Sequence, residues 1–286
     1  MKQSLSMGLT LILTFLISVP ATTVHAAGSQ YEAGLGFEFA SGTYGTGTKT
    51  DSVYLPLTLS AYPTDRIDVS LEIPFVYQSS SSVVAGEFRG MQAQTMASQS
   101  VVAAMNGNGM GGGSLTSASG SGISTAQYGL GDVKLSAGYV LYTEERYVPA
   151  IRPNFYVKFP TADKEKYLGT GAFDEGAAVE LTKWFGDWMA DGEAGYAFQG
   201  TSTVVAVKDY LYYYLGGGYQ VTDNLRPMLF FKGSTPTVEG VGSLLEARLR
   251  IKYQLSTDTG IDGYLSKGIA TASPDYGMGI AIAHSF

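Results

Sequence analysis

The chain contains no cysteine, two histidines and few charged residues. Without cysteine there can be no disulfide, no thiol chemistry and no haem attachment through C-x-x-C-H. Charged residues make up 15% of the 286 residues, and the formal net charge of -7 argues against nucleic acid as a partner. Glycine and tyrosine are abundant instead, with 37 and 20 residues, a bias typical of short strands packed in a closed sheet.

Long apolar runs are also scarce. Lys2 gives the chain a positive start, residues 9–19 form an apolar run too short to span a bilayer, and residues 24–26 suit a cleavage site. Residues 1–26 are therefore predicted to be a signal peptide. The remaining domain, residues 27–286, has no stretch suited to a transmembrane helix, so any membrane crossing must use strands.

Apolar and polar residues alternate along twelve segments, as in residues 31–39, and the connections between them alternate longer and shorter. This pattern predicts an all-β fold: a transmembrane antiparallel up-and-down β-barrel of about 12 strands, embedded in outer-membrane lipid of a Gram-negative bacterium. A soluble sandwich is the alternative, because alternation alone does not distinguish lipid from a protein core. Four prolines inside the expected strands conflict with a closed barrel unless bulges or shifted boundaries absorb them. They are Pro56, Pro74, Pro153 and Pro227.

The last ten residues read G-M-G-I-A-I-A-H-S-F, and Ile282, His284 and Phe286 share the apolar parity. A terminal aromatic suits the membrane boundary of a closing barrel strand. The segment resembles the C-terminal signal that the bacterial barrel-assembly machinery reads, although His284 stands where tyrosine is more usual. The resemblance implies that this machinery is a partner.

Residues 80–125 break the alternation, with Gly/Ser-rich stretches around a middle that contains methionine and alanine. The segment is too long for an ordinary connection between strands. Two interpretations stay open: a segment that folds into the barrel mouth, for which no other loop is expected to be long enough, or a disordered tether.

Residues of the parity opposite to the apolar one are predicted to line the interior. The charged residues expected at a constriction are Glu72, Arg152, Glu180, Glu193, Arg248 and Arg250. Arg248 and Arg250 are expected nearly opposite Glu72, where a transverse field would orient dipolar solutes. Alternatively, the charges pair and fill a narrow lumen, because twelve strands lie between packed eight-stranded and open sixteen-stranded barrels.

Tyrosines are predicted on the same inward face, at Tyr156, Tyr210, Tyr212 and Tyr214. Such rings could carry ring-containing or partly apolar solutes by stacking. Tyrosine as simple lumen filling is the plainer interpretation.

No catalytic residue, metal site or cofactor is predicted. Catalysis by Ser-His or Asp-His pairs needs a histidine, but His25 lies in the expected signal peptide and His284 has lipid-facing parity.

Six stretches together resemble the bacterial family named "Putative MetA-pathway of phenol degradation". They are GLGDV (129–133), KFPTAD (158–163), LGTGAFD (168–174), WFGDW (184–188), GYAFQG (195–200) and YYLGGGYQVTDNLRP (213–227). The resemblance covers residues 129–227 well, and KFPTAD departs from it at Ala162, where glycine is expected. It implies an outer-membrane barrel with a part in the uptake of aromatic compounds.

The expected function is passive passage of small solutes, including aromatic or partly hydrophobic compounds. The alternative is a non-conducting structural or surface-binding barrel. If Arg248 and Arg250 set the selectivity, changing both to glutamate should move the reversal potential toward cation preference.

Overall fold

The computed structural model describes residues 30–45, 48–80 and 126–286. The expected signal peptide and almost all of the 80–125 segment lie outside these residues. Within the described ranges no helix is long and apolar enough to cross a bilayer.

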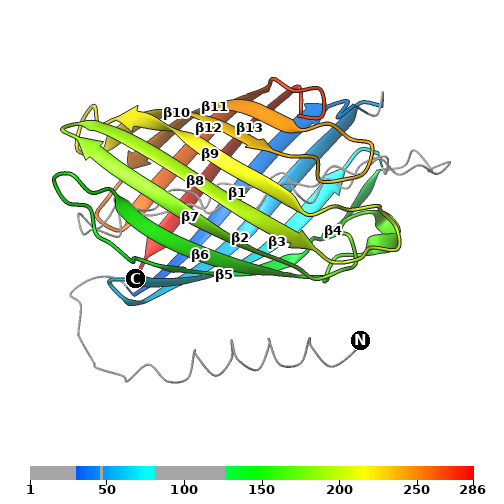
Figure 1. Cartoon of the computed structure of the whole chain (residues 1–286), viewed down its shortest axis with the longest axis horizontal. Helices are drawn as coiled ribbons and strands as arrows, with labels where there is room; N and C mark the ends of the chain where they lie inside the picture. Colours follow the sequence, from blue (N-terminus) through cyan, green and yellow to red (C-terminus); the bar gives the residue numbers. More distant parts are fainter. Residues whose placement is uncertain (1–29, 46–47, 81–125) are drawn as a thin grey trace.

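The chain forms antiparallel strands that close on themselves (Figure 1). The strands are β1 (Tyr31–Gly42), β2 (Thr50–Thr64), β3 (Ile67–Gln78), β4 (Gln127–Leu130), β5 (Val133–Tyr139), β6 (Ala150–Phe159), β7 (Asp174–Phe185), β8 (Trp188–Gln199), β9 (Tyr210–Tyr219), β10 (Leu225–Ser234), β11 (Leu244–Gln254), β12 (Thr259–Gly268) and β13 (Tyr276–Ser285). Consecutive strands pair with each other except β4 and β5, and β13 pairs with β1. Since β4 and β5 both pair with β3, they form one wall strand, and the barrel has twelve. The predicted all-β barrel is confirmed.

Alternation sorts the side chains between the two surfaces of the wall. Every strand exposes large apolar side chains on the outside, including Leu57, Leu249 and Ile280. Aromatic residues are exposed near strand ends: Tyr31, Tyr77, Tyr139, Trp188, Tyr219 and Tyr253. An apolar band bordered by aromatics is the outer surface that a membrane barrel needs.

Pro56 and Pro74 do lie inside strands, facing each other on β2 and β3. The β1–β2 ladder is interrupted beside Pro56, where Gly36 leaves room for the ring: a Cβ on Gly36 would lie 2.9 Å from Pro56 Cγ. Beside Pro74, the partner strand breaks between β4 and β5, and Gly131 N–H donates to the Pro74 carbonyl at 2.8 Å. The missing proline N–H groups therefore fall where the ladders are already broken.

Pro153 and Pro227 lie where one neighbouring ladder has ended. The β5–β6 ladder stops at Asn154, one residue after Pro153, and the β9–β10 ladder begins at Met228, one residue after Pro227. Beyond the end of a ladder no strand pairs on that side, so the absence of a proline N–H removes no inter-strand hydrogen bond there.

The break between β4 and β5 is held by the connection after β6. The Thr161 hydroxyl donates to the Gly131 carbonyl at 2.9 Å and accepts from the Val133 N–H at 2.8 Å. The Ala162 N–H donates to Asp132 Oδ1 at 3.0 Å. Two of the motifs that suggested the family, GLGDV and KFPTAD, are therefore hydrogen-bonded to each other.

Residues 65–66, 186–187, 220–224 and 255–258 are short connections at one end of the barrel, here called the turn end; the opposite end is the loop end. The connection between β5 and β6 lies at the same end and is longer, spanning residues 140–149. It is tied down because Glu144 accepts from Lys183 Nζ at 2.6 Å and from the Trp184 N–H at 2.9 Å.

Candidate functional site

The candidate site is the inner face of the barrel. All ten side chains predicted there, six charged and four tyrosines, are buried inside the wall. The charged ones are 1–6% exposed, so each needs a partner of opposite charge or a hydrogen bond.

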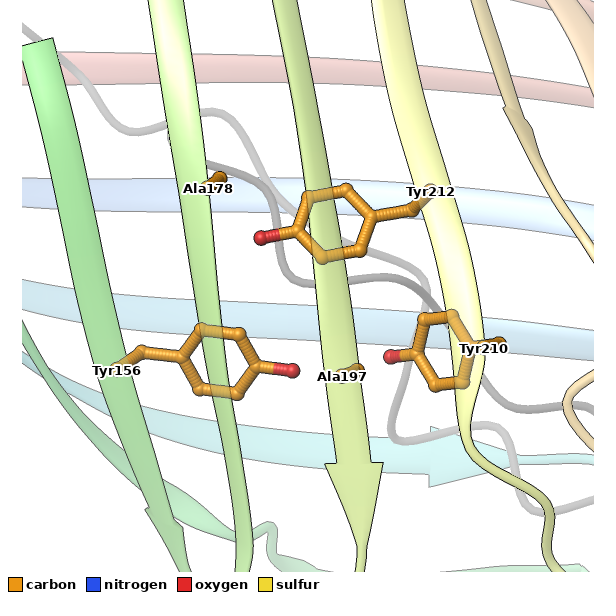
Figure 2. Close-up of a cluster of buried hydrophobic side chains, with 5 residues drawn as sticks. All are labelled: Tyr156, Ala178, Ala197, Tyr210 and Tyr212. Carbon is orange, nitrogen blue, oxygen red and sulfur yellow. The ribbon is translucent and has the colours of Figure 1, made fainter.

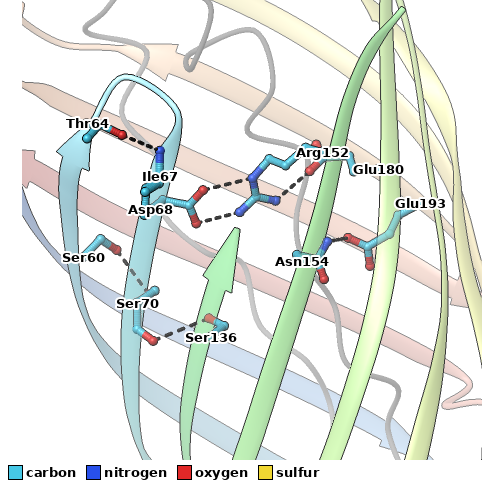
Figure 3. A network of polar contacts seen from close by, with 10 residues as sticks. All are labelled: Ser60, Thr64, Ile67, Asp68, Ser70, Ser136, Arg152, Asn154, Glu180 and Glu193. Carbon is cyan, nitrogen blue, oxygen red and sulfur yellow. Dashed lines mark hydrogen bonds and ion pairs between the residues drawn. The ribbon is translucent and has the colours of Figure 1, made fainter. Parts of the chain in front are cut away.

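Arg152 on β6 is the centre of one charge network (Figure 3). Its Nε and Nη2 atoms donate to Asp68 Oδ1 and Oδ2 at 3.0 and 2.6 Å, and its Nη1 donates to Glu180 Oε2 at 2.8 Å. Asn154, on the same strand, donates to Glu193 Oε2 at 3.1 Å. The planar guanidinium thus joins β3, β6 and β7 through a bidentate and a single contact.

A second network lies on β11 and its neighbours. Arg250 Nε donates to Asp262 Oδ1 at 2.7 Å, and Arg248 Nη2 pairs with Glu246 Oε1 at 2.8 Å. The Arg248 guanidinium also lies over the Tyr264 ring, 4.5 Å from its centroid. These arginines are paired with acids on their own or the adjacent strand.

Glu72 belongs to a third group. It accepts from the Tyr54 hydroxyl at 2.8 Å and lies 3.8 Å from Lys134 Nζ. β3 and β11 lie on nearly opposite sides of the barrel. The charged residues of each group nevertheless pair with residues on their own or adjacent strands. Arg248 and Arg250 therefore lie across the barrel from Glu72, as expected, but the charges on both sides are ion-paired with near neighbours.

The four predicted tyrosines divide into two clusters. Tyr156, Tyr210 and Tyr212 pack with Ala178 and Ala197, and this set is called the tyrosine cluster (Figure 2). In a second cluster Tyr214 stacks on Phe230, with ring centroids 4.3 Å apart and planes inclined by 17°. Met189, Met228 and Trp184 complete that cluster. Tyr214 therefore packs apart from the other three predicted tyrosines.

The connection between β6 and β7, residues 160–173, folds into the loop end. Leu168 is 1% exposed and packs with Tyr54 and Val76 of the inner wall. Its neighbour Tyr167 meets the connections after β8 and β10 in an apolar cluster that contains Val205 and Val238. The expectation that only residues 80–125 could reach inward is therefore wrong, because fourteen residues suffice when both flanking strands end at the rim.

Residues 75–286 match the family described as "Putative MetA-pathway of phenol degradation". The chain belongs to this family. The match extends the resemblance of residues 129–227 to the barrel wall from β3 to the C-terminus. No curated protein sequence matches the chain significantly.

Solved structures similar to this family member include an outer-membrane channel and a porin. The COG4313 outer membrane channel from Pseudomonas putida F1 superposes with a TM-score of 0.65 at 14% identity, covering 94% of this chain and 99% of that one. The NanC porin superposes with a TM-score of 0.52 at 9% identity, covering 89% and 100%. At such low identities the likeness establishes the fold alone.

Several interior residues of this family member were not singled out from the sequence as site residues: Asp68, Glu246, Asp262, Tyr264 and Leu168. The first four have the inward parity that strand alternation predicts, so the missing information was which strand neighbour each one meets. Leu168 gave no periodic signal, because it lies in a connection. Among the described residues, no group of three or more metal-ligating side chains gathers at one point.

Proposed function

We propose that this protein is an outer-membrane channel of a Gram-negative bacterium through which small solutes pass passively, with aromatic compounds the favoured class. The observation that carries the proposal is the tyrosine cluster on the inner wall, between charged groups and inside a barrel with an apolar outer band. Tyrosine rings offer stacking faces to planar solutes, while the paired charges keep the passage polar.

The close pairing of the interior favours a second candidate, a non-conducting structural or surface-binding barrel. Glu180, Glu193 and Arg250 are each 1–2% exposed, so little of their surface is free. Passage through the barrel would require some of them to move aside.

Planar-bilayer recordings and uptake by proteoliposomes separate the two candidates. The channel should give discrete conductance steps and admit phenethyl alcohol faster than protein-free liposomes do. Silence across many reconstitutions of correctly folded protein, judged by heat-modifiable gel migration, would support the non-conducting barrel.

Charge selectivity is expected to depend on Arg248. Changing both Arg248 and Arg250 to glutamate would leave Asp262 and Glu246 without their arginine partners, so Arg248→Gln is the cleaner variant. Glu246 keeps Lys232, whose Nζ lies 3.5 Å from its Oε1. Loss of one positive charge from the passage should move the reversal potential in a salt gradient toward cation preference. Lys166→Gln, at the exposed loop end, is the control, and equal shifts in both variants would place Arg248 off the ion path.

Two further expectations belong to this proposal. Ile282, His284 and Phe286 all point outward, and the Phe286 N–H donates to the Tyr31 carbonyl at 2.9 Å where the barrel closes, as an assembly signal on the last strand would require. Cross-linking from Phe286 to the assembly machinery during export would test it.

We also infer that the protein is not an enzyme, since the histidine within the described residues, His284, bonds Thr259 on the outer face. Hydrolysis of lipid or ester substrates by the pure protein would refute this.

A further inference from the structure

The arginines that face the barrel interior differ in their partners. Arg152, Arg248 and Arg250 each form an ion pair with a carboxylate. Arg226, the second residue of β10, forms no ion pair with any residue of the described ranges. Since a charged side chain inside a barrel is costly without a counter-charge, Arg226 needs an explanation that the other three do not.

The strand register explains why Arg226 has no acidic neighbour. Its direct partner on β11 is Lys252, and on its other side the β9–β10 ladder begins only at Met228. No acid of the described strands therefore faces Arg226 across either ladder. Asp262, one strand further on, is bonded to Arg250. The neighbouring strands thus provide no carboxylate for this arginine.

The contacts that Arg226 makes use only part of its guanidinium group. Its Nε donates to Gln220 Oε1 at 2.6 Å, and the group lies over the Trp184 ring, 4.6 Å from the ring centroid. Nη1 lies 3.9 Å from the Met189 sulfur, which is a weak acceptor. Among the described residues, the edge formed by Nη1 and Nη2 therefore has no strong acceptor. Two parallel N–H donors of this kind match a planar carboxylate.

Trp184 offers a second donor beside the guanidinium. Its indole Nε1 is buried and has no hydrogen-bond partner, and a buried donor of this kind favours a bound acceptor. Arg226 and Trp184 are only half-buried, whereas Glu180 and Arg250 are fully buried. Both also lie within two residues of a turn-end connection, 220–224 or 186–187. A ligand can therefore reach this pair from the turn end without displacing the charges deeper in the barrel.

We propose that Arg226 and Trp184 form a carboxylate-binding site on the inner wall at the turn end. The Nη donors of the guanidinium hold the anion, and the indole N–H donates to the same carboxylate. The inference rests on the proposed channel function, because it names carboxylate-bearing compounds as a class of solute. Short connections lie on the periplasmic side of bacterial barrels, so the site meets a solute where it leaves the barrel.

A purely structural arginine is the competing explanation. The contact with the Trp184 ring and the hydrogen bond to Gln220 stabilise the positive charge of Arg226 without any ligand. They use one face and one N–H of the guanidinium, however, and they leave the indole N–H unsatisfied. A bound carboxylate accounts for the unused donors of both residues.

Titration calorimetry on the full-length detergent-solubilised barrel tests the site with phenylacetate and phenethyl alcohol, which share a ring but differ in the carboxylate. Phenylacetate should bind about tenfold or more tightly, because hydrogen bonds between charged groups are the stronger kind. Inorganic phosphate at matched ionic strength should not displace it. Full displacement by phosphate would mean a general anion site and would overturn the assignment to carboxylates.

Arg226→Gln is the decisive variant. Phenylacetate affinity should fall about tenfold or more, while phenethyl alcohol binding stays unchanged. Arg66→Gln is the matched control, because it removes an exposed arginine from the 65–66 turn at the same end of the barrel. Equal losses in the two variants would mean that only the overall charge matters, and would overturn the site. If heat-modifiable migration shows that Arg226→Gln does not fold, Arg226→Lys replaces it, since lysine keeps the charge but not the paired donors.

Tryptophan fluorescence gives a readout at the site itself. The chain has two tryptophans, so Trp188→Phe leaves Trp184 as the single emitter. Phenylacetate should change its emission saturably, with the dissociation constant found by calorimetry, and phenethyl alcohol should not. An emission that bound phenylacetate leaves unchanged would place the binding elsewhere. Trp184→Phe keeps a ring beneath Arg226 but removes the N–H, and should weaken phenylacetate binding about threefold or more.

Two results separate this site from the proposed channel function. If proteoliposomes admit phenethyl alcohol but the barrel does not bind phenylacetate, the carboxylate site is wrong and the channel stands. If phenylacetate binds in a manner that depends on Arg226 while neither compound enters proteoliposomes, the channel is wrong and the site stands in a barrel that binds without conducting.

Discussion

Replacing Arg152 with methionine is expected to lower the free energy of unfolding by about 3–5 kcal/mol, because the change leaves two acids inside the barrel without their cationic partner. Arg152 is 6% exposed and holds Asp68 and Glu180, whose side chains are 16% and 1% exposed. Methionine fills a similar volume, so the cost arises from unpaired charge rather than from a cavity. Urea titration of the refolded barrel in liposomes, followed by tryptophan fluorescence, measures it.

The control removes one cation from an ion pair in water. Lys166→Met breaks the pair with Asp163, whose side chains are 51% and 46% exposed, and should cost about 1 kcal/mol or less. Adding Asp68→Asn and Glu180→Gln to Arg152→Met should recover most of the loss, since no buried charge then lacks a partner. A loss for Arg152→Met no larger than for Lys166→Met would mean that the two acids are neutral or hydrated in the folded barrel.

The architecture of the wall was predictable because strand geometry produces a regular alternation of apolar and polar residues in the sequence. Successive side chains point to opposite faces, so Arg248 had to face inward once Leu249 faced outward. The lengths of the connections then placed the turns at one end. Both signals are local, and the structure confirms the fold that they predict.

The pairing of the interior charges was not predictable in the same way. Arg250 faces Tyr264 across the β11–β12 ladder, and Asp262 is the partner of Lys252, so the ion pair between Arg250 and Asp262 is a diagonal one. Diagonal neighbours depend on register and on side-chain reach. Without the register, the sequence suggested a field between Arg250 and the distant Glu72, whereas Arg250 in fact pairs with the nearby Asp262.

The split wall strand depended on information from a distant segment. The strand that pairs with β3 breaks at Gly131 and Asp132, opposite Pro74. The Thr161 hydroxyl satisfies the backbone at this break from 30 residues away. The conflict between Pro74 and a closed barrel was visible in the sequence; the connection that resolves it was not.

Placing an arginine on the outer face at mid-barrel is expected to cost about 2–4 kcal/mol in a bilayer, and this tests whether lipid surrounds the barrel. Leu249 lies at the middle of β11 and is 52% exposed, so Leu249→Arg removes little packing inside the protein. The cost should come from carrying a charge at the centre of the hydrocarbon layer. Urea titration in liposomes measures the change in free energy of unfolding.

Leu255 provides a matched control, because it is also 52% exposed but lies just beyond β11 at the turn end. There the arginine can reach water and headgroups, so Leu255→Arg should cost about 0–1 kcal/mol. Equal exposure removes side-chain burial as a cause of any difference between the two variants. A soluble barrel would show equally small costs at both positions, whereas an apolar band in lipid makes the cost depend on depth, and the difference between Leu249→Arg and Leu255→Arg measures that dependence directly.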